Sequence, residues 1–417
     1  MKNKAIFISL LMMIICLVSC ATNGAPGSTI DYKAERAAAW DEYVQAMADA
    51  GVMERELAAE SLDLGDVSMK IGIFVVGDKP ENGYPLYIAL HGGGSSETPD
   101  MNDSQWEMMK DYYRDSLDCG VYVAVRGVRD TWDTHFNPES YPLYDRLIRY
   151  MILSYDVDPN RVYIEGFSAG GDGVYAITAR MADRFAAANM SSGHHNWVNI
   201  DNLYDMPIML QAGEYDEAFD RHIVTAEYGI LLDSLQEQFP GHYVHRVLIH
   251  YNEGHNYEDY DPTPIPVMKS YKAWLEDGDR SHVDEDSYPP HWMNQFTRDP
   301  LPQSVRWNMG VRADMRGVTS FYYLRAPYGT TGIVLVSYDK AENRVTIETD
   351  SLSGDFSVLL NEDMVDFSKP VVFVVNGTEI PMTVTPSLDV LRETTAERGD
   401  PNYQFFAEVS YSNLLNI

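Results

Sequence analysis

A serine stands between two glycines where a strand-like run gives way to a helix-like run. Residues 163–171 read YIEGFSAGG and fit the pattern G-x-S-x-G, with Gly166, Ser168 and Gly170 in the defined positions. In this pattern a strand turns abruptly into a helix, and side chains at the two glycine positions would collide inside the turn. We therefore predict that Ser168 is a nucleophile, exposed above a sheet at a helix N-terminus that favours developing negative charge.

A second glycine-rich stretch, HGGG at residues 91–94, follows the apolar run YPLYIAL. Acyl transfer creates an oxyanion that needs preorganised N–H donors about 3 Å away, and glycines let the backbone approach it closely. We expect the donors to be the amide of Gly92 or Gly93 together with that of Ala169, the residue after the serine. His91 is expected to brace the loop and is also a candidate for substrate contact. The alternative is a flexible glycine-rich turn without a role in catalysis.

A serine hydroxyl is a poor nucleophile and needs a histidine base that is itself oriented by a carboxylate. After the run MPIMLQAG comes EYDEAFDR, where Asp216 is the expected acid and Glu214, Glu217 and Asp220 are rivals. The run HRVLIHYNEG then leads to His255. A histidine just beyond the end of a strand, on a loop that starts with glycine, can swing over the sheet to the serine. His255 is therefore the predicted base.

Two further loops lie beyond strand-like runs and could form the walls of a site. They are SSGHHNW, after FAAANM, and RGVRDTWDTHF, after GVYVAV. Their candidates for substrate contact are Trp132, His194, His195 and Trp197. Ordinary loop packing explains these residues equally well. Paired histidines can also bind metal, but no further ligands have the required spacing, so neither a metal nor a cofactor is expected.

Apolar runs of strand length alternate with amphipathic helical stretches over much of the chain. This alternation predicts right-handed crossovers and a mostly parallel sheet with helices on both faces. We assign residues 30–278 to such an α/β domain, which begins with helical sequence over residues 30–64. An acidic, turn-rich linker is predicted at residues 279–299. Short β-branched runs separated by turn signals then predict a small antiparallel β-sandwich domain over residues 300–417, with one late helix.

The first twenty residues, MKNKAIFISLLMMIICLVSC, have the pattern of a secretory signal peptide, with an apolar run too short for an ordinary membrane-spanning helix. The ending LVSC resembles the bacterial lipobox, whose cysteine is lipidated. We expect residues 1–19 to be a lipoprotein signal peptide, Cys20 to be lipidated, and residues 20–29 to be a flexible tether. The protein would then be exported and anchored to a membrane of the bacterial cell envelope, facing the periplasm or the cell surface. An uncleaved anchor or an ordinary cleaved signal is the alternative.

The charge balance bears on possible partners. The formal net charge is −32, with 31 lysines and arginines against 63 aspartates and glutamates. Such a surface repels phosphate backbones, so nucleic acid is not an expected partner.

With HGGG, GFSAGG, GEYD and EGH in this order, the chain resembles the α/β-hydrolase superfamily over about residues 65–278. More narrowly, it looks like the capless esterases related to polyhydroxybutyrate depolymerases and to feruloyl and acetyl-xylan esterases. Hormone-sensitive-lipase-like esterases share HGGG but usually have aspartate before the serine, where this chain has Phe167. The resemblance implies a set of roles: Ser168 as nucleophile, His255 as base, Asp216 as orienting acid, and Gly92, Gly93 and Ala169 as the oxyanion-hole region.

The leading hypothesis is therefore a lipid-anchored serine esterase that acts outside the cytoplasm on small-molecule or polysaccharide-linked esters. The first alternative is a serine peptidase of the prolyl-oligopeptidase type, which uses the same catalytic residues. The second is a non-catalytic lipoprotein that binds glycan or a partner through the β-domain. The presence of every residue type that catalysis needs argues against the second, since a binding-only relative would be free to lose them.

Overall fold

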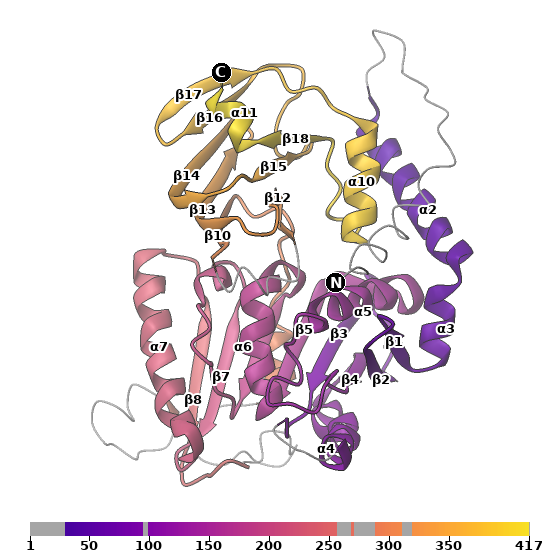
Figure 1. The fold of residues 1–417 in the computed structure, drawn as a ribbon, viewed down its shortest axis with the longest axis vertical. Helices are drawn as coiled ribbons and strands as arrows, with labels where there is room; N and C mark the ends of the chain where they lie inside the picture. Colours follow the sequence, from indigo (N-terminus) through magenta and orange to yellow (C-terminus); the bar gives the residue numbers. More distant parts are fainter. Residues whose placement is uncertain (1–29, 95–98, 257–267, 271–287, 311–318, 417) are drawn as a thin grey trace, which may run out of the picture.

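The computed structural model describes residues 30–94, 99–256, 268–270, 288–310 and 319–416 (Figure 1). The predicted signal peptide and tether lie outside the described residues.

The largest element in the described residues is a nine-stranded sheet with the order β1-β2-β4-β3-β5-β6-β7-β8-β9. Its central strands, from β4 through β3 and β5 to β8, run parallel, while β1, β2 and β9 are antiparallel to their neighbours. Its strands are β1 (Ser61–Asp63), β2 (Ser68–Val76), β3 (Tyr84–Leu90), β4 (Gly120–Val125), β5 (Val157–Phe167), β6 (Ala187–Ser191), β7 (Ile208–Gly213), β8 (His245–His250) and β9 (Met268–Ser270). The predicted, mostly parallel sheet is therefore confirmed.

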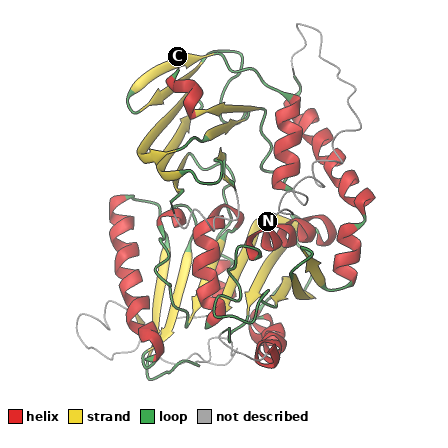
Figure 2. Cartoon of the chain, viewed as in Figure 1, coloured by secondary structure: helices red, strands yellow, loops and turns green. Residues whose placement is uncertain are grey.

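Helices cover both faces of this sheet (Figure 2). The described helices are α2 (Tyr32–Ala50), α3 (Val52–Ala58), α4 (Pro99–Tyr112), α5 (Ser140–Tyr155), α6 (Ala169–Met181), α7 (Arg221–Gln238), α9 (Pro289–Met293), α10 (Leu388–Arg398) and α11 (Tyr411–Leu415). Short 3-10 turns are η2 (Arg114–Ser116), η3 (Ala182–Arg184), η4 (Asp201–Leu203) and η5 (Ala218–Asp220).

Alternate residues of the central strands face two separate cores, as the period of two in a strand requires. On β3, Leu86 and Ile88 belong to the core under α5, α6 and α7, whereas Tyr87 and Ala89 belong to the core under α4 and α9. Both faces of the strand are buried, which explains why the sequence of β3 is almost continuously apolar.

The strand-rich C-terminal region consists of two small sheets in the described residues. One has the order β10-β13-β14-β16-β17 and the other β11-β12-β15-β18. The strands of the first are β10 (Ser304–Asn308), β13 (Thr331–Asp339), β14 (Arg344–Ser353), β16 (Val371–Val375) and β17 (Thr378–Met382), and those of the second are β11 (Ser320–Phe321), β12 (Leu324–Arg325), β15 (Ser357–Leu360) and β18 (Ala407–Ser410). The expectation of purely antiparallel pairing is wrong for β14 and β16, which pair in parallel. The chain leaves this sheet for β15 and re-enters it at β16, so the two strands run in the same direction.

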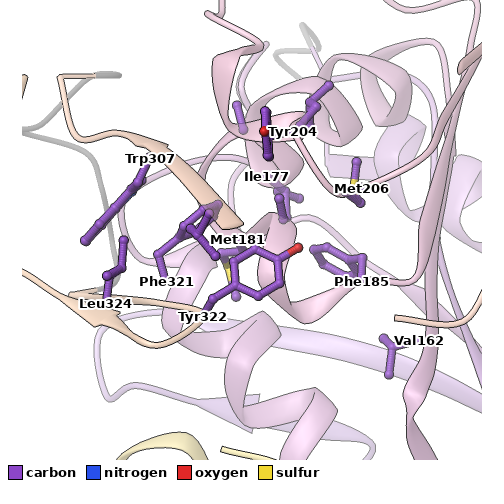
Figure 3. Close-up of a cluster of buried hydrophobic side chains, with 14 of the residues drawn as sticks. Val162, Ile177, Met181, Phe185, Tyr204, Met206, Trp307, Phe321, Tyr322 and Leu324 are labelled. Atoms are coloured by element: carbon purple, nitrogen blue, oxygen red, sulfur yellow. The ribbon is translucent and has the colours of Figure 1, made fainter. Parts of the chain in front are cut away.

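The C-terminal module, defined here as residues 304–310 and 319–416, shares one hydrophobic core with the α/β domain. Met181 and Phe185, at the end of α6 and just beyond η3, lie in the same buried cluster as Trp307, Phe321 and Tyr322 (Figure 3). Figure 3 also shows Tyr204 and Met206, which precede β7, in this cluster. The two parts of the chain therefore do not have separate cores.

Buried ion pairs and hydrogen bonds fix the same interface. Arg398 pairs with Asp183, and Arg298 pairs with Asp400 at 2.8 Å. The amide of Arg298 also donates to the carbonyl of Asn160 at 2.9 Å. Asn160 lies near the start of β5 and Asp183 shortly before β6. The C-terminal module therefore packs against the amino-terminal ends of the parallel strands.

Two predicted boundaries are wrong. Part of the predicted linker 279–299 belongs to the α/β domain, because Trp292 and Met293 on α9 are buried in the core beneath α4. The predicted N-terminal helical segment 30–64 is broken at Gly51, whose φ is 59°, and it ends in the strand β1. Its first helix, α2, packs against α10 of the C-terminal module.

Candidate active site

Strand β5 and helix α6 meet at Ser168 in the sharp turn that the sequence motif predicted. Ser168 has φ 57° and ψ −118°, a conformation that costs a non-glycine residue roughly 1–3 kcal/mol and persists only where the surroundings enforce it. A Cβ on Gly166 would lie 2.4 Å from the carbonyl oxygen of Gly170, and one on Gly170 would lie 2.0 Å from that of Leu90. Both glycines are therefore required by close backbone contacts around the serine.

The hydroxyl of Ser168 lies against His255, and the imidazole of His255 lies against Asp216. Nε2 of His255 is 2.9 Å from Oγ of Ser168, and its Nδ1 is 2.9 Å from Oδ2 of Asp216. Because an ionised carboxylate can only accept, Nδ1 carries the proton and Nε2 accepts from the serine hydroxyl. The carboxylate is fully buried, whereas one third of the imidazole is exposed. This geometry can take a proton from the serine and stabilise the imidazolium that forms.

The structure places the three rival acids elsewhere. Glu214 is buried, and its Oε2 accepts a hydrogen bond at 3.1 Å from a backbone amide in the loop that carries the histidine. Glu217 and Asp220 lie at the turn η5, which leads into α7. Of the four candidates, Asp216 is the one that hydrogen-bonds His255.

The loop that carries His255 is held by close contacts on several sides. A Cβ on Gly213 would lie 1.9 Å from the carbonyl oxygen of Gly254, so the loops after β7 and β8 touch backbone to backbone. Oγ of Ser192 donates to the carbonyl of His255 at 3.0 Å. The ring of Phe167 lies beside the imidazole, with 5.2 Å between centroids. These contacts restrict the position of the base relative to the serine.

The glycine stretch lies directly beside the serine. A Cβ on Gly92 would be 3.3 Å from Cβ of Ser168, and one on Gly94 would be 3.0 Å from Cβ of Ala169. Gly93 and Gly94 have φ of 100° and 90°, values that side chains rarely allow. The amide of Gly94 donates to a buried asparagine side chain of α4 at 2.9 Å. The amides of Gly92 or Gly93 and of Ala169 remain the candidate donors to an oxyanion.

His91 and His135 form a buried brace beneath this stretch. Nε2 of His91 accepts from the amide of Gly127 at 3.1 Å, so its Nδ1 carries the proton and donates to the carbonyl of Gly92 at 2.6 Å. Nε2 of His135 donates to the carbonyl of His91 at 2.9 Å. Burial lowers the pKa of His91 to about 4 and holds the pKa of His135 well below its usual value. Because His91 is completely buried, its candidacy for substrate contact is wrong.

Under the catalytic loops, four buried side chains form a chain of hydrogen bonds across β8, β7 and β6. Nε2 of His250 donates to Oε1 of Gln211 at 2.9 Å, and Nε2 of Gln211 donates to Oδ1 of Asn189 at 3.0 Å. Nδ2 of Asn189 donates to Oγ of Ser191 at 2.9 Å. Burial lowers the pKa of His250 to about 3, so its ring stays neutral. The carbonyl of Ser191 accepts from the amide of Ser168 at 2.9 Å, which connects this chain to the nucleophile.

Trp132 borders the glycine stretch from the connection between β4 and α5. Its backbone carbonyl oxygen is 3.2 Å from the position of a Cβ on Gly94. Its side chain is 51% exposed and contacts Phe136 edge-on. This place fits the predicted substrate contact, which stays a prediction.

The other candidates lie on the loop after β6, which is fixed to the first turn of α6. Oδ1 of Asp172 accepts from the amide of His194 at 2.7 Å. The ring of His195 is stacked on Tyr228 of α7, with 4.2 Å between centroids, and burial lowers its pKa to about 4. Trp197 is 84% exposed. The two histidines and Trp197 line a cleft of about 750 Å³ next to the catalytic loops.

Three further features bear on the sequence predictions. Cys20 lies outside the described residues. None of the helices in the described part of the chain is long and apolar enough to cross a membrane. Among the described residues, no group of three or more His, Cys, Asp or Glu side chains lies close enough together to hold a metal ion.

The sheet order and the Ser–His–Asp constellation together have the arrangement of the α/β-hydrolase fold. Residues 144–261 match the Prolyl oligopeptidase family. A bifunctional acetylxylan esterase/xylanase from Neocallimastix patriciarum is 30% identical over 157 residues, which is 37% of this chain and 22% of that protein. The chain thus spans about a fifth of that relative's length. The predicted resemblance to α/β-hydrolase esterases is confirmed by these findings.

Two solved structures are also similar. A thermostable esterase has a TM-score of 0.37 and 18% identity, covering 57% of this chain and 62% of that one. LpqC, a poly(3-hydroxybutyrate) depolymerase from Bordetella parapertussis, has a TM-score of 0.37 and 15% identity, covering 54% and 88%.

The sequence predicted the brace by His91, but sequence reasoning missed the other residues that position the catalytic ones. The buried hydrogen-bond chain had a signal, because Asn189, Gln211 and His250 are polar residues near the ends of otherwise apolar strands. The contacts of Ser192 and Phe167 with His255 had none, because they depend on how separate loops meet.

Proposed function

We propose that this protein is a serine hydrolase that cleaves carboxylic esters through a covalent acyl-enzyme. The observation that carries this proposal is the line of hydrogen bonds from Ser168 through His255 to buried Asp216. The line ends beside a glycine stretch whose backbone approaches the serine.

In the proposed reaction, Oγ of Ser168 attacks the ester carbonyl while Nε2 of His255 takes its proton. The carbonyl oxygen becomes an oxyanion, which accepts hydrogen bonds from the amide of Ala169 and from that of Gly92 or Gly93. The imidazolium, stabilised by Asp216, then protonates the leaving alcohol, and the acyl-enzyme remains. Water, whose proton His255 takes, then attacks the acyl carbonyl. The bond to Oγ breaks, the acid leaves, and His255 returns the proton to Ser168.

We propose that the substrate is either an ester group attached to a polysaccharide or a small-molecule ester. The name of the relative from Neocallimastix patriciarum, an acetylxylan esterase, favours such a substrate. The exposed ring of Trp132, which borders the glycine stretch, would offer an apolar face to such a chain.

A second candidate is a peptidase with the same catalytic residues. The match of residues 144–261 to the Prolyl oligopeptidase family favours it. A peptidase would hydrolyse aminoacyl arylamides at a rate that Ser168→Ala abolishes, whereas an esterase would cleave esters and leave the arylamides intact, and this comparison separates the two.

We further propose that residues 1–19 are a signal peptide, that Cys20 is lipidated, and that the protein acts outside the cytoplasm, in the periplasm or at the cell surface. The start of α2 packs against the C-terminal module, because Tyr32 contacts Phe367 and Phe406. This module, whose two sheets we take to form a β-sandwich, lies at the end of the parallel strands opposite Ser168. A lipid on Cys20 would therefore hold the catalytic edge away from the membrane. Palmitate labelling that survives Cys20→Ser would refute the anchor.

The enzyme proposal is tested with the mature chain and the variant Ser168→Ala. We expect the wild type to hydrolyse p-nitrophenyl acetate and to react with a fluorophosphonate probe. In the variant, kcat should fall by about 10³-fold or more and labelling should disappear, because the triad acts as a unit. A wild type that neither turns over nor labels would contradict the proposal.

A further inference from the structure

A cleft of about 750 Å³ opens between the loop of residues 194–201 and helix α7. Its lining combines aromatic rings with carboxylates and an amide. The residues that matter here are Trp197, Asn199, Phe219, Asp220, Glu227 and Tyr228. Among the described residues that line the cleft, none is a lysine or an arginine.

The two walls of this cleft continue directly from the catalytic loops. On one side is the loop after β6. Oγ of Ser192 in this loop donates to the carbonyl of His255 at 3.0 Å, and the loop continues from Ser192 to Trp197. On the other side, Phe219 follows three positions after Asp216. The end of the cleft that Trp197 and Phe219 form is therefore the end toward the catalytic loops, whereas Leu231 and Leu235 of α7 line it farther along.

Trp197 and Phe219 have the highest exposed fractions, 84% and 75%, among the large hydrophobic side chains of the described residues. Both also have positive φ, 55° and 59°. A left-handed backbone is uncommon for bulky residues. Tyr243 and Tyr322 also have positive φ, but their rings are buried in the core, whereas the rings of Trp197 and Phe219 are exposed and lie on one cleft. Exposed apolar surface of this kind is a candidate contact for a ligand.

The chemistry of the cleft selects a neutral polyhydroxylated ligand. The ring of Trp197 stands edge-on to His194 and His195, which leaves it as an open platform instead of one wall of an aromatic cage. Arg221 already lies over the ring of Phe219, at 4.9 Å from its centroid. The carboxylates of the lining repel an anion. A cation would pair with those carboxylates without using the two exposed aromatic faces, and the spermine titration below tests that alternative. A sugar ring has flat apolar faces for the aromatic rings and hydroxyl edges for Glu227 and its polar neighbours.

We propose that this cleft is a subsite that binds neutral sugar units of the chain that carries the ester. This inference rests on the proposed function and names the substrate class for the same site. Trp197 and Phe219 would hold sugar rings by stacking, and the carboxylate of Glu227 would accept hydrogen bonds from their hydroxyls.

The test compares two substrates in the full mature chain: acetylated xylohexaose and p-nitrophenyl acetate, which is too small to reach the cleft. We expect Trp197→Ala and Phe219→Ala each to lower the ratio of kcat/KM on the hexasaccharide to that on p-nitrophenyl acetate by about tenfold, through loss of stacking and buried apolar contact. Tyr328→Ala is the matched control, because Tyr328 is also an exposed aromatic, at 65%, but belongs to the C-terminal module. Its ratio should stay at the wild-type value.

A binding experiment separates this inference from the proposed catalysis. Ser168→Ala is titrated with unacetylated xylohexaose and mannohexaose by calorimetry, with spermine as a cationic probe. The subsite is supported if Ser168→Ala binds at least one hexasaccharide and the double variant with Trp197→Ala does not. This holds even if the wild type proves catalytically inactive. Three results would each overturn the subsite and leave the esterase proposal standing. They are an unchanged ratio of the two kcat/KM values in both aromatic variants, no binding of either hexasaccharide, and binding of spermine alone.

Discussion

Two histidines of the candidate site, His91 and His255, differ in exposure and therefore in what they can do. His255 is one-third exposed and touches the serine, so it can exchange protons during a reaction. His91 is completely buried, and its two ring nitrogens are used in hydrogen bonds to the carbonyl of Gly92 in the oxyanion region and to the amide of Gly127 after β4. Protonation of His91 would put a second proton where Nε2 must accept from Gly127. The glycine stretch therefore requires a histidine that remains neutral.

The pH dependence of stability should report this requirement. Burial lowers the pKa of His91 to about 4 in the folded chain, whereas the unfolded value is about 6.5. Between these values the unfolded chain binds more protons, so the free energy of unfolding rises with pH, by about 1.4 kcal/mol per pH unit for one histidine, and levels off above about 6.5. We expect His91→Gln to reduce this slope by that amount in denaturant titrations from pH 4.5 to 7.5. Parallel curves for the wild type and the variant would contradict the assignment.

The ends of β6, β7 and β8 are linked by side chains as well as by backbone pairing. Gln211 on β7 is central, since it accepts from His250 on β8 and donates to Asn189 on β6. Strand β7 leads into the loop of Asp216, and β8 leads into the loop of His255. Strand β6 is hydrogen-bonded to the amide of Ser168. A buried chain of this kind fixes spacing more strictly than apolar packing would, because each donor has one acceptor at a set distance.

Gln211→Met tests this positioning role, since methionine has a similar shape but leaves the buried donor of His250 and the acceptor of Asn189 unsatisfied. Each such group costs about 1–3 kcal/mol, so the free energy of unfolding should fall. We also expect kcat to fall about tenfold or more with little change in KM, because a small misplacement affects the reacting geometry most. Thr178→Val is the control: it removes a buried hydrogen bond, at 2.6 Å to Val174, within α6 alone. If both variants lose stability and neither loses kcat, the chain has only a structural role.

Much of the candidate site could be predicted because acyl transfer by a serine needs particular residue types, and these stand directly after strand-like runs. Ser168, His255 and the glycine stretch each follow an apolar run, and the structure brings all three together. Asp216 could not be separated from Glu214 by sequence, because both follow β7 and the choice depends on which side chain turns toward the imidazole. The role of buried polar residues such as Gln211 depends on neighbours in other strands, which one sequence does not reveal.

The order of elements in the fold could be predicted, whereas the boundary between its parts could not. Alternating strands and helices indicate the parallel sheet by their periodicity. The segment around Trp292 has the prolines and charges of a linker, and its burial depends on a groove formed by distant residues. In the same way, the contact of α2 with α10 joins segments some 340 residues apart, where local pattern carries no information.

At the scale of the whole molecule, the C-terminal module and the α/β domain are joined by buried charges. The guanidinium groups of Arg298 and Arg398 both lie over the ring of Tyr403, at 4.8 and 4.2 Å from its centroid. Asp183 and Asp400 pair with these arginines, and all four charged side chains are less than a tenth exposed. The module packs at the amino-terminal ends of the strands, so its described residues support the sheet from the side opposite the serine.

This arrangement predicts that the two parts unfold together. In Asp183→Asn the buried guanidinium of Arg398 loses its charged partner, which costs about 3–5 kcal/mol because a buried charge is left uncompensated. Calorimetry should show a single transition at a clearly lower Tm, and kcat on p-nitrophenyl acetate at 25 °C should be unchanged. Glu379→Gln is the matched control, because it removes the exposed pair with Arg344 within the module, and such pairs contribute about 1 kcal/mol or less. If Asp183→Asn were as mild as this control, or if the module melted in a separate earlier transition while activity persisted, the shared core would not couple the two parts.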